Sequence, residues 1–135
     1  MKSDQRRPIL CMVLLASFLT PFMGSAVNIA LPSIGREFGL DAVTLNWIAT
    51  AYLLSSCMFL LPLGKLADIK GRKKIFTIGM AIFTLACLFC GLARSTTFLL
   101  AGRVLQGIGA AMIFSTGVAI LTAVYPAGTL LGFAL

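Results

Sequence analysis

The chain has 135 residues, of which 59% are hydrophobic and only 11% are charged. A soluble domain of this size needs more charged residues to cover its surface. The composition therefore excludes a soluble domain and indicates an integral membrane protein. The net charge of +7 lies in short segments beside apolar runs, where it orients a membrane protein. The sequence has no His and no zinc-ligand spacing, and we expect no nucleic-acid partner.

The apolar runs predict four membrane helices. A crossing of the hydrocarbon core needs about 20 predominantly apolar residues. The predicted spans are residues 9–31, 46–63, 75–93 and 98–124. The first is too long for the apolar region of a signal peptide, typically about 7–15 residues, so we read it as a retained helix. We therefore expect an all-α integral membrane fold in which residues 1–135 form a single membrane region.

The Lys and Arg residues predict how these helices are oriented. Eight of them lie in the N-terminal tail or between the second and third spans: Lys2, Arg6, Arg7, Lys65, Lys70, Arg72, Lys73 and Lys74. The opposite side has only Arg36 and Arg94. Because positive residues remain on the cytoplasmic side, we expect a multi-pass protein of the cell membrane. Its N-terminus and the loop of residues 64–74 would be cytoplasmic.

Small or short side chains recur at every fourth position in two spans. The rows are Ala16, Thr20, Gly24 and Asn28, and Gly107, Ala111, Ser115 and Ala119. Such spacing lets helix backbones approach closely. We expect helix packing at Gly24, Gly107, Ala111 and Ser115, with chance in a Gly- and Ala-rich sequence as the alternative.

The four cysteines all fall inside apolar runs. Cys87 and Cys90 have CxxC spacing, which in a soluble loop would suggest redox or metal chemistry. In a membrane helix we interpret them as packing residues. The sequence also lacks a phosphate-binding glycine loop, a metal-ligand cluster and a nucleophile–base pair. We expect no cofactor, no metal and no enzymatic activity.

Arg103 is the only charged residue within a predicted span, and a charge at membrane depth is a functional hypothesis by default. Asn28 lies at a similar depth from the same surface and is a possible hydrogen-bond partner. Gln106, nearly one turn deeper, would extend the polar patch. The alternative is that Arg103 only snorkels to the interface. The chain's acids lie in tails or loops, at Asp4, Glu37, Asp41 and Asp68, so none is placed at membrane depth to carry a proton.

Residues 64–74 resemble the signature loop between helices two and three of the major facilitator superfamily. The matching positions are Gly64, Leu66, Ala67, Asp68, Gly71, Arg72, Lys73 and Lys74. Ile69 stands where a basic residue often follows the Asp. The resemblance implies that Asp68 and Arg72 form a charge relay that latches one half of the transporter to the other. A basic loop that only sets orientation is the alternative.

Three further segments are similar to the drug:proton antiporter group, especially its fourteen-helix branch. They are residues 28–32, 47–54 and 99–111, in the expected order. In the last of these the resemblance implies that Arg103 faces the central cavity and takes part in proton coupling. We expect Asn28 and Gln106 to be further candidates for the cavity and for proton coupling, beside Arg103.

The chain departs from this branch in two places. Met23 replaces an acid often found five residues before Asn28, which places proton coupling by that route in doubt. Residues 125–129 carry no charge, whereas the branch continues with charged residues into helix five. We interpret the chain as an N-terminal part of such a transporter that lacks its C-terminal half.

The resemblance implies proton-coupled efflux of a drug or other small molecule, cationic or lipophilic. Its partners would be the lipid bilayer, the substrate and protons. The alternative is a stand-alone four-helix membrane protein that associates with itself or another subunit and transports nothing.

Overall fold

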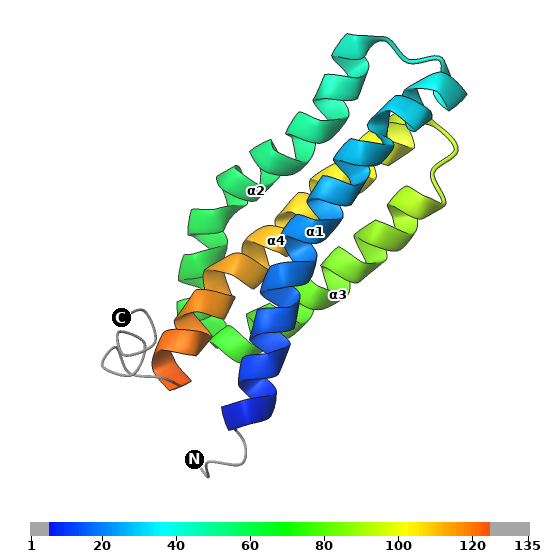
Figure 1. Cartoon of the computed structure of the whole chain (residues 1–135). Coiled ribbons are helices and arrows are strands. Elements are labelled where there is room, and N and C mark those ends of the chain that lie inside the picture. The colour runs from blue at the N-terminus through cyan, green and yellow to red at the C-terminus, as the bar shows by residue number, and fades with distance from the viewer. Residues whose placement is uncertain (1–5, 125–135) are drawn as a thin grey trace, which may run out of the picture.

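The computed structural model describes residues 6–124, which form four long antiparallel α-helices (Figure 1). The helices are α1 (Arg6–Phe38), α2 (Ala42–Lys70), α3 (Arg72–Gly91) and α4 (Thr96–Val124). All four are long and apolar enough to cross a membrane, which confirms the predicted fold class. The predictions made for Lys2, Asp4 and residues 125–135 lie outside the described residues.

The helices extend beyond most of the predicted spans. α1 has 33 residues, which is about 50 Å at a rise of about 1.5 Å per residue, whereas the hydrocarbon core is about 30 Å thick. The exception is α3, which ends at Gly91, before the predicted end at residue 93. Leu92 has φ −95° and ψ 2°, outside the helical region, so residues 92 and 93 belong to the turn before α4.

The α2–α3 junction is a sharp corner. The prediction that residues 64–74 form a loop is wrong. Residues 64–70 are the last turns of α2, and α3 begins at Arg72. Only Gly71 is non-helical. Its φ of 100° lies in a region that glycine adopts without steric cost. Its N–H donates to the Ala67 carbonyl at 3.0 Å, which caps α2.

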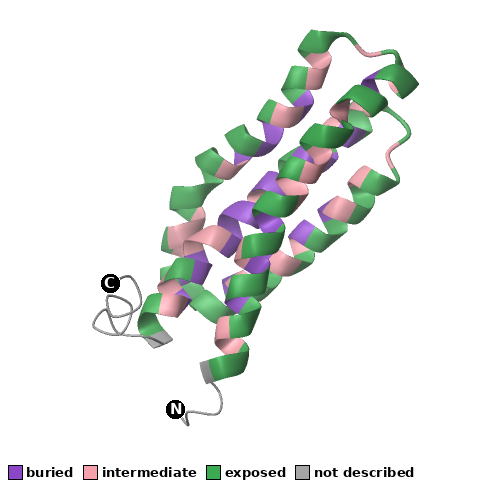
Figure 2. Ribbon diagram, viewed as in Figure 1, coloured by how far each residue is buried: buried purple, intermediate pink, exposed green. Residues whose placement is uncertain are grey.

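α4 is the central helix of the bundle. It packs along α2 and α3, while α1 contacts it and α2 more sparsely. Among the described residues, α4 has more buried positions than any other helix (Figure 2). The main buried cluster joins all four helices through Ala16, Tyr52, Phe83, Ala110 and Ile113. Large apolar side chains such as Leu15 and Phe18 point outward, as expected of a lipid-facing surface.

Glycines on two faces of α4 allow close contact with its neighbours. A methyl group at Gly107 would lie 2.6 Å from the Tyr52 carbonyl oxygen on α2. One at Gly109 would lie 2.8 Å from the Phe83 nitrogen on α3. The row of small residues at every fourth position predicts close packing at Gly107 but not at Gly109, which lies outside that row.

The other predicted packing residues also lie between helices. A methyl group at Gly24 of α1 would lie 3.4 Å from the Tyr52 ring. Ala111 is fully buried. Ser115 faces α2, where a methyl group at Gly64 would lie 3.6 Å from the Ser115 Cβ.

Candidate functional site

Arg103 is the centre of a buried polar network. It lies in the second turn of α4, and only 1% of its surface is exposed. Its Nη1 donates to Gln106 Oε1 at 2.8 Å, and its Nε donates to the Ile48 carbonyl on α2 at 3.4 Å. The guanidinium carbon lies 5.2 Å from the centre of the Tyr52 ring, which is cation–π distance.

Gln106 connects this network to α3. Its Nε2 donates to the Cys87 sulfur at 3.2 Å. The chain Arg103–Gln106–Cys87 therefore links α4 to α3, while Ile48 and Tyr52 link Arg103 to α2. Because a buried polar group in lipid must find a protein partner, this network fixes the position of the guanidinium.

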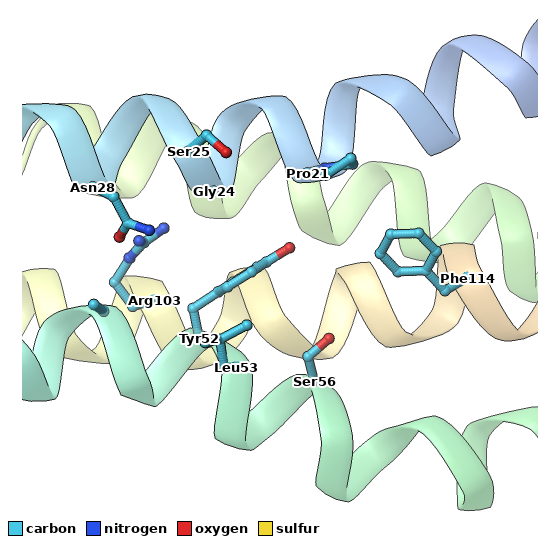
Figure 3. Close-up of a pocket in the computed structure, with 10 residues that line it drawn as sticks. Pro21, Gly24, Ser25, Asn28, Tyr52, Leu53, Ser56, Arg103 and Phe114 are labelled. Carbon is cyan, nitrogen blue, oxygen red and sulfur yellow. The ribbon is translucent and has the colours of Figure 1, made fainter.

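A cavity of about 310 Å³ opens beside Arg103, between α1, α2 and α4 (Figure 3). Its polar lining is Ser25, Asn28, Tyr52, Ser56 and Arg103. Its apolar lining includes Pro21, Leu53 and Phe114. A concave site with an apolar wall and a few convergent polar groups is the usual form of a small-molecule site.

The structure places Asn28 and Arg103 in the same cavity. The hydrogen bonds of Arg103 in the described part of the chain go to Ile48 and Gln106, and none to Asn28. Figure 3 shows the Asn28 side chain pointing from α1 toward the guanidinium. The two groups therefore face the same space from opposite walls.

The sequence pattern predicts no role in the site for two of its members, Tyr52 and Cys87. Tyr52 belongs to the segment 47–54 that carries the family resemblance, but nothing in that pattern shows that its ring stacks on Arg103. Cys87 was interpreted as a packing residue, and it does pack against the core. Its hydrogen bond to Gln106 depends on the rotation of α3 against α4, which the sequence does not specify.

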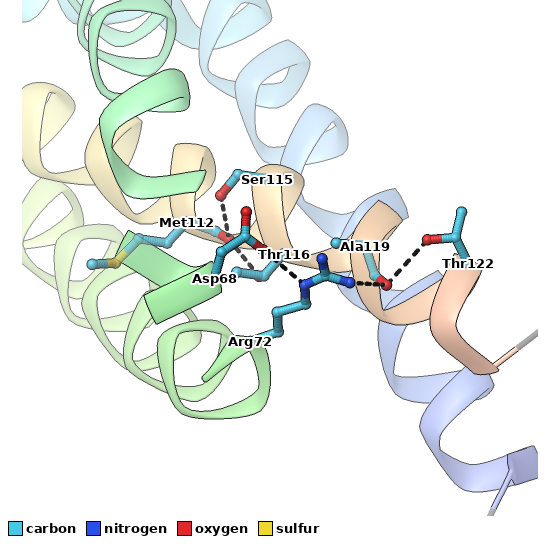
Figure 4. Close-up of polar contacts among 7 residues, drawn as sticks. All are labelled: Asp68, Arg72, Met112, Ser115, Thr116, Ala119 and Thr122. Carbon is cyan, nitrogen blue, oxygen red and sulfur yellow. Dashed lines mark hydrogen bonds and ion pairs between the residues drawn. The ribbon is translucent and has the colours of Figure 1, made fainter. Parts of the chain in front are cut away.

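A second polar cluster lies at the corner between α2 and α3 (Figure 4). Arg72 Nε is 3.0 Å from Asp68 Oδ1, and Arg72 Nη1 donates to the Ala119 carbonyl on α4 at 3.0 Å. Gly64 and Lys73 flank this cluster, on the last turns of α2 and the first turn of α3. Because Arg72 and Asp68 are both substantially exposed, solvent weakens their ion pair. The contact to Ala119 joins the corner to the end of α4.

The long apolar helices, the central arginine and the polar cavity define a multi-pass membrane protein with a candidate small-molecule site. Residues 13–135 match the model of the Major Facilitator Superfamily. The chain belongs to this superfamily.

Several relatives are similar over most of this chain. The riboflavin transporter RibZ of Clostridioides difficile is 31% identical over 91% of the chain and 27% of its own length. The cephamycin export protein CmcT of Amycolatopsis lactamdurans is 37% identical over 94% of the chain and 26% of its own length. The multidrug resistance protein Stp of Mycobacterium tuberculosis is 39% identical over 74% of the chain and 19% of its own length. The chain thus spans about a quarter of the length of the first two relatives.

Proposed function

We propose that this chain forms the first four helices of a proton-coupled exporter of small molecules. The cavity between α1, α2 and α4 would be one wall of its substrate site. The observation that carries this proposal is the buried Arg103 beside that cavity. It lies seven residues into α4, about 10 Å from the end of the helix at a rise of about 1.5 Å per residue. Retaining a charge at this depth is costly, and such residues mark substrate and ion pathways.

Transporters of this superfamily have two halves, each built from inverted three-helix repeats, with the substrate site at the interface. α1, α2 and α3 would form the first repeat, and α4 would begin the second. The cavity lies where α1 meets α2 and α4. Alternating access therefore needs the opposite half, which would supply the other wall.

Proton coupling would use Arg103 as a fixed charge, because an arginine does not release its proton in proteins. A group that binds and releases the proton would change its interaction with this charge during the cycle. In this proposal that group belongs to the rest of the transporter. The pair of Asp68 and Arg72 would take part in the latch between halves that the resemblance implies.

A chimera tests the function. In it, this chain replaces the matched segment of Stp, and we measure resistance of cells to the drugs against which Stp protects. We expect the chimera to protect cells and an uncoupler of the proton gradient to abolish efflux from them. Arg103→Ala should remove protection. Arg94→Ala, at an exposed arginine outside the site, should preserve it.

Two outcomes would contradict the proposal: full protection by the Arg103→Ala chimera, or protection that survives the uncoupler. The 135 residues expressed alone should not export a cationic dye, because one cavity wall cannot alternate its access. Proton-dependent efflux by the chain alone would contradict the need for a second half.

A further inference from the structure

The charge of Arg103 has no counter-charge among the described residues 6–124. Its contacts among the described residues are the Gln106 amide, the Ile48 carbonyl and the Tyr52 ring, all of which are neutral. The sequence has four acids. Asp4 lies outside the described residues, and Glu37, Asp41 and Asp68 are exposed near helix ends. The cavity wall therefore carries one full positive charge.

Part of the guanidinium is free to bind a ligand. An arginine has five N–H donors, and the two hydrogen bonds that Arg103 makes in the described part use one on Nε and one on Nη1. Nη2 makes none there. Arg103 is one of the residues that line the cavity. The N–H groups of Nη2 can donate to a ligand oxygen in the cavity.

The surrounding cavity suits an organic anion. The side chains of Ser25, Asn28 and Ser56 provide neutral hydrogen-bonding groups, and Leu53 and Phe114 provide an apolar wall. A carboxylate on Nη2 would form a charge-assisted hydrogen bond, which is among the stronger protein hydrogen bonds. An organic cation would instead meet an uncompensated positive charge of the same sign, in a site where little water screens it.

We therefore infer that this cavity selects organic anions, such as small aromatic carboxylates, through Arg103. The inference rests on the proposed function, because it takes this cavity to be the substrate site. It narrows the substrate class and disfavours the cationic drug that the sequence suggested.

Two dyes of the same ring system and opposite charge test this selectivity. Fluorescein is an anion and rhodamine 123 a cation, and both are built on a xanthene ring. We measure the fluorescence anisotropy of each dye with the purified 135-residue chain in nanodiscs of phosphatidylcholine, which has no net charge. We expect Arg103→Gln to weaken fluorescein binding by about tenfold or more, as for a lost hydrogen bond to a charged group. Rhodamine 123 should bind the variant at least as well as it binds the parent chain.

Asn28→Asp is the second variant, because it changes no residue that contacts Arg103 in the network of Gln106, Ile48 and Tyr52. It adds a carboxylate of nearly the same shape on the opposite wall, so it should weaken fluorescein binding and strengthen rhodamine 123 binding. Arg94→Gln removes an exposed positive charge elsewhere and should change neither affinity. Stronger binding of rhodamine 123 than of fluorescein by the parent chain would overturn the inference. So would fluorescein affinities unchanged by both Arg103→Gln and Asn28→Asp.

The binding assay requires no transport, so the two proposals fail separately. A Stp chimera without efflux, together with an intact preference for fluorescein, counts against the proposed function alone. A chimera that exports drugs, together with a preference for rhodamine 123, overturns only the anion selectivity.

Discussion

The position of Arg103 depends on Gln106, which is the residue that lets the guanidinium stay inside the bundle. Gln106 accepts from Arg103 through its oxygen and donates to Cys87 through its nitrogen. The amide is thus used at both ends, and only 2% of the Gln106 surface is exposed. A side chain that cannot accept a hydrogen bond would leave one buried N–H of Arg103 without a partner.

We predict that Gln106→Leu lowers the free energy of unfolding by about 1–3 kcal/mol, the cost of an unsatisfied buried polar group. Cys87→Ala should cost less than Gln106→Leu, because the thiol is a weak hydrogen-bond acceptor. Denaturant unfolding in detergent micelles measures both values. Equal losses in the two variants would show that the Arg103–Gln106 bond adds nothing beyond packing.

At the scale of the helix, α4 is positioned by glycines that face two different neighbours. Gly107 faces α2 and Gly109 faces α3, and in each case the nearest atoms include backbone atoms. Backbone cannot rotate away as a side chain can. The tight packing of α4 therefore depends on the absence of a side chain at both positions.

We predict that Gly109→Ala destabilises the bundle by about 1–3 kcal/mol, as overpacking of a filled core does. Gly91→Ala is the matched control. Gly91 is the last residue of α3 and an added methyl group there meets no atom within 4 Å, so this change should be neutral or slightly stabilising. Thermal unfolding followed by circular dichroism compares the two. A Gly109→Ala variant as stable as Gly91→Ala would contradict the close α3–α4 contact.

The beginning of α2 is stabilised by a cap that responds to pH. Asp41 accepts hydrogen bonds from the hydroxyl and the backbone N–H of Thr44. These two hydrogen bonds hold the pKa of the Asp41 carboxyl below its usual value, and the bond from the hydroxyl has the larger effect. A lowered pKa means that the stabilisation is complete above the pKa of the unfolded chain. It is lost as the pH falls through the lowered pKa of the folded state.

We therefore predict that acidification frays the first turn of α2 before the rest of the helix. Amide hydrogen exchange at Thr44 should accelerate at low pH, relative to the intrinsic rate. Asp41→Asn retains a capping oxygen but has no titrating group there, so its Thr44 protection should not change over the same pH range. The same pH response in both proteins would rule out Asp41 as its cause.

For the whole molecule, hydropathy predicts four helices but not their arrangement. In a soluble protein the apolar face of a helix marks the core, whereas a membrane helix is apolar on both its lipid side and its protein side. Leu105 is exposed and Ile113 is fully buried, yet both are aliphatic residues of α4. The central place of α4 follows from glycine contacts that appear only when α2 and α3 are assembled against it.

The residues of the candidate site could be predicted from the sequence only in part. Arg103 stands out because a charge is rare at membrane depth, whereas Tyr52 and Cys87 are ordinary residues of apolar helices. The prediction of a loop over residues 64–74 is wrong, because the basic residues there lie on the ends of α2 and α3 and not in a loop. Asp68, on the last turn of α2, pairs with Arg72, the first residue of α3, across the corner. A single glycine with positive φ makes the turn between them.

The orientation of the whole molecule is the last feature that can be tested. Among the described residues, seven Lys and Arg residues lie on the side of the α2–α3 corner and two, Arg36 and Arg94, on the other, which predicts that the corner is cytoplasmic. Two exposed apolar positions suit a labelling experiment, because their replacement leaves the charge balance unchanged. Ile69 lies at the corner, 81% exposed, and Leu92 lies in the α3–α4 turn, 67% exposed.

We predict that an impermeant maleimide added to intact spheroplasts labels Leu92→Cys and not Ile69→Cys. In inside-out vesicles the pattern should reverse. The parent chain, whose four native cysteines lie within the helices, sets the background. Labelling of Ile69→Cys in intact spheroplasts would show that the topology is the inverse of the predicted one. The Arg103 cavity would then lie nearer the cytoplasmic face, and an exporter would have to release its substrate past the α2–α3 corner.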